Sequence, residues 1–456
     1  MLLERIVAEG LAHNSYLIGS GGEGAVIDPR RDCGIYIDIA QQNHLVIRHI
    51  FETHRNEDYV VGSLELSRLC GAAVWHGTHM PFLYGKPVRA GDKFTLGSLE
   101  ITVLETPGHT EESISLVVRD RDVADEPYLV FCGDTLFAGD IARTDFYGPD
   151  RKSEMAAKIF DSIAGKILSL GDGVIVCPAH GAGSICGGDI ADHPFTTVGY
   201  ERQTNPWILM GREAFIGQRV TESPYLPPYF RRMEQYNRDG APLLPCNPFL
   251  KFLSVAEVNE CRKTGCQIVD IRSPTSFGGG HIPGSLSIWR EGLASFMGWF
   301  LDYEKPVILV DDFNLDLDRV ARHFIRLGYD NLAGVLAGGF SAWTKAAGEI
   351  ASIQTCSARQ LKERLEKESP FLLDVRDIRH WRSLGHIRNA HHVYVGELPQ
   401  HLAEIPKNGP VVVYCDAGFK GSLAASVLAR DNYRSVTNLL GGMTAWIQAG
   451  FRTDFI

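Results

Sequence analysis

The C-terminal part of the chain contains an internal repeat, which restricts the possible folds more than any other sequence feature. Four pairs of segments match at an offset of 103–105 residues: Ile268–Arg272 with Leu372–Arg376, Gly280–Ile282 with Gly385–Ile387, Pro306–Asp311 with Pro410–Cys415, and Gly338–Trp343 with Gly441–Trp446. A nearly constant offset of this size predicts two copies of one domain of about 100 residues. We place them at 251–352 and 353–456 and expect α/β domains with short parallel sheets.

Residues 1–250 lie outside the repeat and are expected to form a further domain, because 456 residues are too many for one core. Proline-rich stretches at 224–229 and 241–248 predict a connector packed on that domain. A net charge of −10 argues against a nucleic-acid partner. Neither a membrane-spanning apolar run nor a secretory signal is evident, so we expect a cytoplasmic protein without a membrane partner.

Within residues 1–200, each of four predicted strands ends at a polar segment that contains a histidine or an aspartate. The four residues are His54, His109, Asp134 and His180, and Asp58 follows the first of them closely. Ligand sites in layered α/β folds lie beyond strand ends. The recurrence therefore predicts that these side chains meet in one metal site.

The segments around these residues resemble the metallo-β-lactamase superfamily and imply its αββα sandwich over roughly the first 200 residues. They are Thr53-His54, Thr106–Thr110, Gly133–Phe137 and Pro178–Gly181. The superfamily pattern Thr-His-x-His-x-Asp-His is incomplete, because Asn56 and Tyr59 stand at two histidine positions. Binuclear zinc hydrolases such as glyoxalase II use those histidines with Asp58 and His180, so each metal would lose a ligand here.

A smaller ligand set is intact. His54, His109 and Asp134 form the two-histidine, one-carboxylate combination of non-haem Fe(II) oxygenases. The chain resembles the persulfide dioxygenases, the iron branch of the superfamily, which implies one Fe(II) per chain. By this resemblance Arg143 would contact a carboxylate of the thiol carrier; the alternative is a structural ion pair. We expect Asn56, Tyr59 and His180 to surround the ligands, and Asp58 to form a hydrogen bond within its loop.

Cys415 lies between a predicted strand and a predicted helix, in the loop Cys415–Gly421 of the second copy. Backbone N–H groups at a helix N-terminus stabilise a thiolate and lower its pKa, which favours a nucleophilic role. This copy resembles rhodanese sulfurtransferases, in which the cysteine carries a sulfane sulfur and the loop binds it. Gly418 permits the tight loop, and Lys420 is either an anion contact or a solvated lysine. Asp416 opposes a strongly stabilised thiolate.

The first copy has Asp311 where the second has Cys415, so we expect it to be inactive and to serve a structural or docking role. The other cysteines form no Cys-x-x-Cys pair and are expected to be buried or free thiols.

The whole chain resembles a bacterial fusion of a persulfide dioxygenase with two rhodanese-like domains. The resemblance implies oxidation of a glutathione or coenzyme A type persulfide by O₂ to sulfite, coupled to sulfane-sulfur transfer through Cys415 that yields thiosulfate, a chemistry of sulfide detoxification. Two alternatives remain: a binuclear-zinc thioester hydrolase of glyoxalase II type with sulfurtransferase activity, and a metal-free scaffold beside a working rhodanese domain. Fold analogy alone suggests a homo-oligomer.

Overall fold

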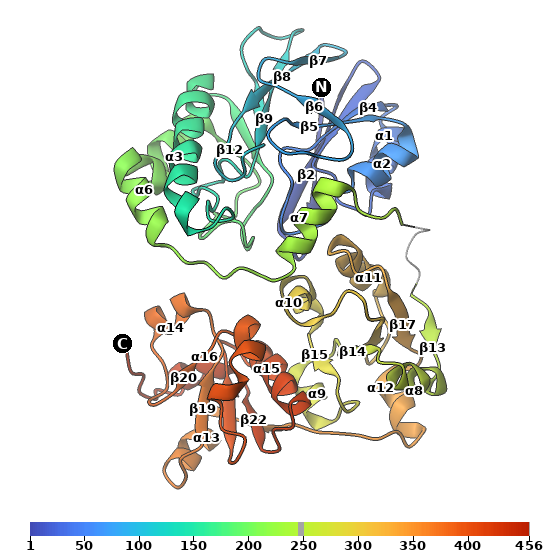
Figure 1. Ribbon diagram of the computed structural model, residues 1–456, viewed down its shortest axis with the longest axis vertical. Helices are drawn as coiled ribbons and strands as arrows, with labels where there is room; N and C mark the ends of the chain where they lie inside the picture. Colours follow the sequence, from blue (N-terminus) through green and yellow to red (C-terminus); the bar gives the residue numbers. More distant parts are fainter. Residues whose placement is uncertain (245–249, 456) are drawn as a thin grey trace. The chain divides into compact units, whose positions relative to one another are not determined.

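The computed structural model describes residues 1–244 and 250–455, which form two compact units (Figure 1). The first unit ends where the undescribed residues 245–249 begin, and residues 325–328 also cluster with it. The last part of the predicted connector, 245–248, lies outside the described residues.

The first unit contains two six-stranded sheets. One has the order β1 (Leu2–Ala8), β2 (His13–Ser20), β3 (Glu23–Ile27), β4 (Val46–Phe51), β5 (Ala73–Gly77), β6 (Lys86–Val88). The other has the order β12 (Thr196–Thr197), β11 (Ile175–Pro178), β10 (Leu129–Gly133), β9 (Ile114–Asp120), β8 (Leu99–Glu105), β7 (Lys93–Leu96). In β8 every second residue is buried, as expected for a strand with one face on a core.

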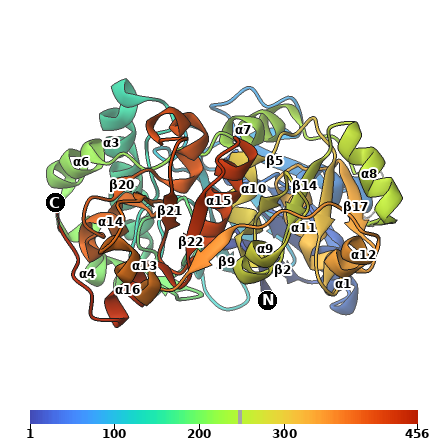
Figure 2. The ribbon, with the colours of Figure 1, turned by 90° about the horizontal axis from the view of Figure 1, so that it is seen from below.

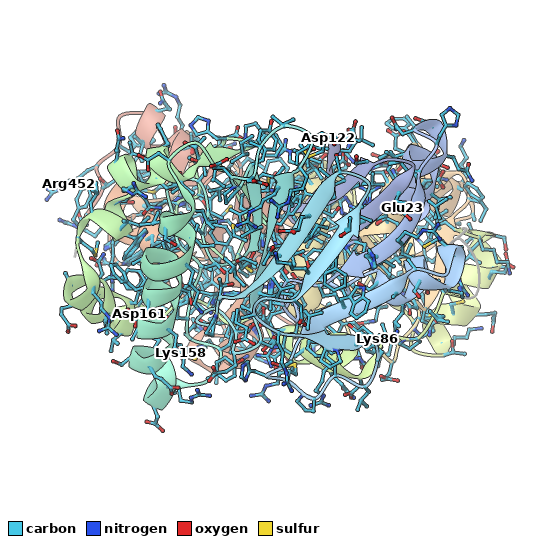
Figure 3. The ribbon with its side chains drawn as sticks, turned by 90° about the horizontal axis from the view of Figure 1, so that it is seen from above. Glu23, Lys86, Asp122, Lys158, Asp161 and Arg452 are labelled. Atoms are coloured by element: carbon cyan, nitrogen blue, oxygen red, sulfur yellow. The ribbon has the colours of Figure 1, made fainter. Side chains whose placement is uncertain are left out.

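Helices cover the outer faces of both sheets and complete four layers (Figure 1). Tyr36 of α1 (Gly34–Gln42) and Leu66 of α2 (Ser63–Cys70) pack against the first sheet. Ile159 of α3 (Lys152–Ser162) and Phe215 of α6 (Arg212–Thr221) pack against the second. Charged residues such as Asp161 lie on the outer face of α3 (Figure 3). This arrangement is the predicted αββα sandwich.

The segment after the sandwich packs on the first unit and helps to shape the His54 loop. It contains α4 (Val198–Thr204), α5 (Pro206–Leu209) and α7 (Phe230–Asp239). In α7, Asn237 accepts a hydrogen bond from the Val61 N–H and donates to the carbonyl oxygens of Asn56 and Tyr59. One buried amide thus holds the loop at three backbone groups.

The second unit contains two five-stranded parallel sheets with the same strand permutation. The first copy has the order β13 (Phe252–Leu253), β17 (Leu332–Leu336), β16 (Val307–Val310), β14 (Gln267–Asp270), β15 (Leu286–Ser287). The second has β18 (Gln354–Cys356), β22 (Val436–Leu439), β21 (Val411–Tyr414), β19 (Phe371–Asp374), β20 (His391–His392). The shared permutation confirms that the sequence repeat is a structural repeat.

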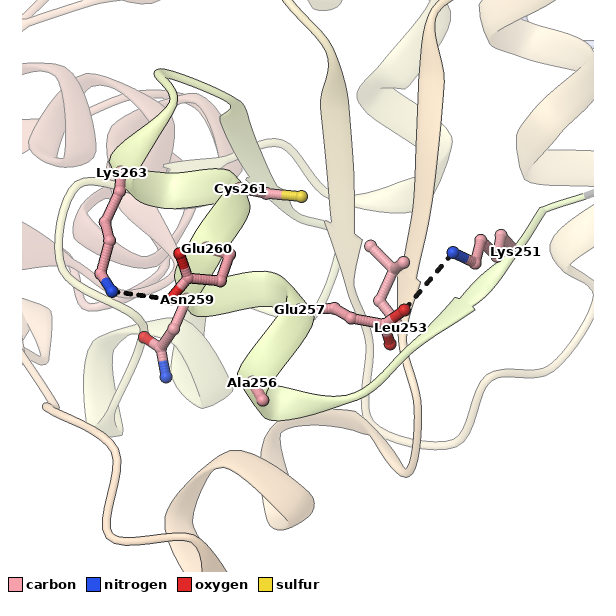
Figure 4. A pocket seen from close by; sticks show the side chains of 8 residues that line it. All are labelled: Lys251, Leu253, Ala256, Glu257, Asn259, Glu260, Cys261 and Lys263. Atoms are coloured by element: carbon pink, nitrogen blue, oxygen red, sulfur yellow. Dashed lines mark hydrogen bonds and ion pairs between the residues drawn. The ribbon is translucent and has the colours of Figure 1, made fainter.

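Corresponding helices also recur in the two copies. The first copy contains α8 (Val255–Lys263), α9 (Pro274–Gly279), α10 (Leu293–Phe300), α11 (Leu317–Arg326) and α12 (Gly339–Lys345); the second contains α13 (Ala358–Leu365), α14 (Ile378–Leu384), α15 (Phe419–Arg430) and α16 (Gly442–Gln448). A surface pocket on α8 is lined by Cys261 and by the Lys251–Glu257 and Lys263–Glu260 ion pairs (Figure 4). Cys261 thus lies on α8, about 50 residues before the loop that contains Asp311, and is not part of that loop.

Helix α15 lies between the two copies (Figure 2). The hydroxyls of Ser287 and Ser422 are 2.8 Å apart, and the Ser426 hydroxyl accepts a hydrogen bond from the Ser287 N–H. At the N-terminal end of α15, the Phe419 ring lies 5.1 Å from the Trp289 ring of the first copy. The first copy therefore supports the helix that begins directly after the Cys415 loop. Among the described residues no helix is long and apolar enough to cross a membrane.

Candidate functional sites

The structure brings His54, His109 and Asp134 together from the ends of β4, β8 and β10. Asp134 Oδ2 lies 3.5 Å from His109 Nε2 and 3.8 Å from His54 Nε2, and all three residues are buried. Donors bonded to one ion at about 2.1 Å, and about 90–110° apart, lie roughly 3.0–3.5 Å from each other. The three side chains are therefore close to the spacing that a shared metal ion requires.

Hydrogen bonds orient both histidines for metal binding. His109 Nδ1 donates to the Arg143 carbonyl at 2.9 Å, so Nε2 is the nitrogen that faces the other candidate ligands. His54 Nδ1 lies 2.9 Å from the Thr53 hydroxyl, which donates to Asp28 at 2.7 Å. Burial lowers the pKa of His54 to about 4, which keeps the imidazole neutral. His109 Nε2 and Asp134 Oδ2 are buried and have no hydrogen-bond partner in the described part of the chain, so the donors fit a metal.

Glu57 is a further donor that the sequence did not indicate. Its side chain is wholly buried, and Oε2 lies 3.4 Å from His109 Nε2. Burial acts to raise its pKa, but His109 and Arg55 more than offset this effect and lower the pKa to about 2. Glu57 occupies a variable position of the superfamily pattern, so its only signal was a second acid beside Asp58. The structure groups it with His54 and His109.

Asn56 and Tyr59 are wholly buried near these ligands. Asn56 has φ = 42°, a conformation that asparagine tolerates better than most residues, and its amide donates to the His54 carbonyl. The Tyr59 ring lies 4.0 Å from the His13 ring, and its hydroxyl is 3.5 Å from the Asp28 carbonyl. Asn56 thus supports the backbone of a candidate ligand.

The predicted loop hydrogen bond of Asp58 is wrong. Its carboxylate points instead at His180, with Oδ2 3.0 Å from Nε2, while His180 Nδ1 lies 2.7 Å from Asp134 Oδ1. Burial lowers the pKa of His180, but Asp134 and Asp58 outweigh it and raise the pKa well above its ordinary value. His180 therefore connects Asp58 to the Asp134 carboxylate. Asp58 and His180 also form a possible ligand group with Cys186.

Arg143 forms a structural ion pair, which was the alternative to its predicted contact with the thiol carrier. Its guanidinium binds both carboxylate oxygens of Asp145, at 2.7 and 2.8 Å, and donates to the Tyr225 carbonyl. It also lies over the Phe146 ring. These contacts fix the segment whose carbonyl orients His109.

In the second unit, Cys415 lies directly after β21, and Gly418 is the N-terminal cap of α15. The Gly418 N–H donates to Cys415 Sγ at 3.1 Å, so the loop forms the predicted N–H cradle. The Met443 N–H reaches the Cys415 carbonyl at 2.7 Å. Gly442 makes this approach feasible, because a Cβ at this residue would lie 2.2 Å from that carbonyl oxygen.

The predicted lowering of the Cys415 pKa is wrong. Burial of the thiol raises the pKa, and Lys420 with the N–H groups of Gly421, Gly418 and Ala417 offsets only part of this effect. Lys420 is neither free nor merely solvated: it forms a 2.7 Å ion pair with Asp416, which also contacts His380. The Asp416 carboxylate thus neutralises part of the Lys420 charge, which would otherwise stabilise the Cys415 thiolate.

In the corresponding loop of the first copy, backbone N–H groups and an arginine bind the carboxylate of Asp311. Asp311 Oδ2 accepts hydrogen bonds from the N–H groups of Phe313 and Asn314, at 3.3 and 2.6 Å, and from Arg290 at 2.7 Å. The Phe340 N–H reaches the Asp311 carbonyl as Met443 reaches that of Cys415. The loop geometry is therefore retained, but a carboxylate takes up N–H groups of the cradle and leaves no sulfur nucleophile.

Comparison with known proteins supports this division of the chain. Residues 8–180 match the metallo-beta-lactamase superfamily, and 254–346 and 357–449 match the rhodanese-like domain. The crystal structure of a metallo-beta-lactamase from Staphylococcus aureus subsp. aureus COL is 30% identical and covers 74% of this chain and 98% of its own, with a TM-score of 0.66. The chain therefore belongs to the metallo-β-lactamase superfamily. Two rhodanese-like domains follow its metallo-β-lactamase domain, which confirms the predicted fold class.

Two further relatives match the N-terminal part. The hydroxyacylglutathione hydrolase GloC of Haemophilus influenzae is 25% identical over 231 residues, which are 46% of this chain and 98% of GloC. The crystal structure of ETHE1 from Myxococcus xanthus is 27% identical and covers 52% of this chain and 98% of its own, with a TM-score of 0.46. Both families represented in the chain include enzymes, and the first binds metal.

Proposed function

We propose that the protein oxidises a low-molecular-weight thiol persulfide with O₂ in an Fe(II)-dependent reaction and transfers sulfane sulfur through Cys415. The observation that carries the proposal is the presence, in one chain, of a buried two-histidine, one-carboxylate set and a rhodanese loop that retains its cysteine. The substrates would be a glutathione or coenzyme A type persulfide, O₂ and sulfite.

In the first unit, His54, His109 and Asp134 would hold the iron. When bound, Fe(II) would supply O₂ activation next to the terminal sulfur, with positions left open for both even if Glu57 also binds. Thr53 and the Arg143 carbonyl keep both imidazoles in the ligand tautomer. Burial of the ligands excludes bulk water from the reacting sulfur.

The overall reaction of this unit would convert R–S–SH, O₂ and H₂O into R–SH, sulfite and two protons. In the second unit, the Cys415 thiolate would attack the outer sulfur of a second R–S–SH molecule and release R–S⁻. Cys415 would then carry this sulfane sulfur as a persulfide, stabilised by the N–H group of Gly418. Sulfite would attack the outer sulfur, forming thiosulfate and releasing the Cys415 thiolate. Placing both sites in one chain raises the effective concentration of sulfite at the second site.

The test is to purify the protein anaerobically, measure its bound metal and follow O₂ uptake with glutathione persulfide. Iron bound to the chain and persulfide-dependent O₂ uptake are expected. A protein that binds no iron and consumes no O₂ with glutathione or coenzyme A persulfide would refute the dioxygenase. Full sulfurtransferase activity in a metal-free protein would instead identify the first unit as a scaffold.

Two observations favour a second candidate function, thioester hydrolysis by a zinc centre. The GloC relative is named a hydroxyacylglutathione hydrolase, and Asp58 and His180 lie together beside Asp134. Zinc content and cleavage of lactoylglutathione, without persulfide-dependent O₂ uptake, would establish this function.

A further inference from the structure

Glu57 is a buried carboxylate at a variable position of the superfamily pattern, which assigns it no metal. We propose that Glu57 is a fourth ligand of the metal and supplies the donor that is lost where Asn56 replaces the second histidine. The ligand set would then contain two histidines and two carboxylates: His54, Glu57, His109 and Asp134. This inference rests on the metal site of the proposed function, but not on persulfide oxidation being the reaction.

The Glu57 carboxylate lies at the spacing expected of a shared ligand. Its Oε2 is 3.4 Å from His109 Nε2, and Asp134 Oδ2 is 3.5 Å from the same nitrogen. The ligand atoms of His54, Glu57 and His109 all lie within 4.8 Å of one another. Two donors bonded to one ion at about 2.1 Å lie roughly 3.0–3.5 Å apart. Glu57 is therefore placed towards His109 in the same way as the predicted ligand Asp134.

Three of these donor atoms have no hydrogen-bond partner within the described ranges: Glu57 Oε2, His109 Nε2 and Asp134 Oδ2. The three residues are at most 2% exposed. An unpaired carboxylate oxygen in a buried site is costly. One cation that contacts both carboxylates and the imidazole would remove this cost, and the two carboxylates would balance the double charge of an ion such as Fe(II).

Arg55 orients the Glu57 carboxylate. Its Nε donates to Glu57 Oε1 at 3.2 Å, while Glu57 Oε2 is the oxygen that lies beside His109. Arg55 is itself held by two further acids, because its Nη2 donates to Glu234 of α7 and its backbone N–H donates to Glu112, both at 3.2 Å. A carboxylate that binds a metal is usually held by a hydrogen bond of this kind. One oxygen of Glu57 is thus fixed by Arg55, and the other is available to an ion.

The turn at Asn56 explains why residue 57, and not residue 56, reaches the histidines. In an extended segment the side chains of residues 54 and 56 would share one face, and that of residue 57 would lie on the other. Asn56 has φ = 42°, which interrupts this alternation, and its amide donates to the His54 carbonyl at 3.1 Å. The Asn56 side chain is therefore engaged by the backbone, and the carboxylate of Glu57 lies beside the His109 imidazole.

A second carboxylate ligand has a measurable consequence for the bound ion. It adds one negative charge beside the metal, which stabilises Fe(III) relative to Fe(II) and lowers the midpoint potential of this couple. It also replaces an imidazole by a harder donor, which favours ions such as Fe(II) and Mn(II). An octahedral ion with these four ligands still has positions open for the sulfur and O₂ of the proposed reaction.

The first test compares full-length Glu57→Gln with the parent protein. Both are stripped of metal and titrated anaerobically with Fe(II) in competition with a chelator. We expect the affinity of Glu57→Gln to fall by more than about 100-fold, which exceeds the about 10–100-fold loss caused by removing a residue that only supports a ligand. The Fe(III)/Fe(II) midpoint potential should rise. Glu234→Gln is the matched control, because it removes a different carboxylate from Arg55 and should change both quantities little.

The second test uses the parent protein, so it decides the matter even if Glu57→Gln fails to fold. Infrared difference spectra between the metal-free and the Zn(II)-loaded protein report the carboxylates that bind the ion. Labelling with ¹³C-glutamate should move one metal-induced carboxylate band to lower frequency, whereas ¹³C-aspartate should move the band of Asp134. Metal-induced bands that respond only to labelled aspartate, or a parent-like affinity of Glu57→Gln for Fe(II), would overturn the fourth ligand.

These outcomes are distinguishable from those of the dioxygenase test. A chain that binds metal through Glu57 but shows no persulfide-dependent O₂ uptake would refute the proposed reaction and leave the ligand in place. Persulfide-dependent O₂ uptake together with a parent-like affinity of Glu57→Gln would refute the ligand alone.

Discussion

The carbonyl oxygen of Arg143 accepts a hydrogen bond from Nδ1 of His109 at 2.9 Å. Arg143 therefore orients a candidate metal ligand through its backbone carbonyl, while its guanidinium forms an ion pair with Asp145. His54 has a corresponding support in the hydroxyl of Thr53, which is linked to Asp28. These contacts, more than the ligands themselves, decide which imidazole nitrogen faces a metal.

Thr53→Val should weaken metal binding about 10–100-fold, because valine cannot accept the His54 Nδ1–H and the tautomer is no longer fixed. Competitive titration against a chelator measures the change. Thr106→Val is the matched control, since the Thr106 hydroxyl is equally buried but bonds the hydroxyls of Ser115 and Thr135 instead of a candidate ligand. Equal losses of affinity in both variants would show that the hydroxyl acts through general stability.

Cys415→Ser should abolish thiosulfate formation while leaving persulfide-dependent O₂ uptake unchanged, because a hydroxyl cannot carry a sulfane sulfur. Both products are measured in one reaction with glutathione persulfide and sulfite. Cys356→Ser, at the end of β18 in the same copy, is the control and should retain both activities. A parallel loss of O₂ uptake in Cys415→Ser would contradict two separable sites.

The sulfurtransferase rate should increase from neutral to alkaline pH. Burial raises the pKa of Cys415, so the thiol is mainly protonated near neutrality, and its thiolate fraction grows about tenfold per pH unit below the pKa. Lys420 lowers that pKa, so Lys420→Ala should move the pH profile to higher pH, and Lys420→Arg should largely restore it. Superimposable profiles for the parent and Lys420→Ala would mean that the lysine does not act on the thiol.

Asp311→Ala should destabilise the first rhodanese-like copy by about 1–3 kcal/mol, because the variant leaves N–H groups and Arg290 without their acceptor. Since a multidomain chain has no single unfolding transition, hydrogen exchange in β14 and β16 is the suitable measurement. Asp312→Ala, whose ion pair with Arg272 is long at 3.5 Å and half-exposed, should change exchange by less than about 1 kcal/mol. Equal exchange in both variants would contradict a structural role for the Asp311 carboxylate.

The fold could be read from the sequence because its signals are local and repeated. The constant offset between Asp270–Arg272 and Asp374–Arg376 required one architecture for both copies, and each pair forms the same buried ion pair. Likewise, His54, His109, Asp134 and His180 follow four strands, β4 of the first sheet and β8, β10 and β11 of the second, and the ends of these strands meet at one edge of the sandwich.

The errors concern properties that only the folded chain determines. Cys186 and Glu57 carried no spacing signal, because their approach to the histidines depends on the course of two loops. Asp58 was assigned to its own loop, whereas its partner, His180, lies at the end of a strand in the other sheet. The pKa of Cys415 was predicted from its N–H groups alone, and the degree of burial that opposes them is invisible in the sequence.

The carboxylate of Asp311 occupies N–H groups in the loop that corresponds to the Cys415 cradle, and Arg290 neutralises it. Replacing Asp311 by cysteine alone would remove the anion that Arg290 pairs with, and replacing Arg290 alone would leave the aspartate without its counterion. Each single change should therefore cost stability in the copy that packs against α15.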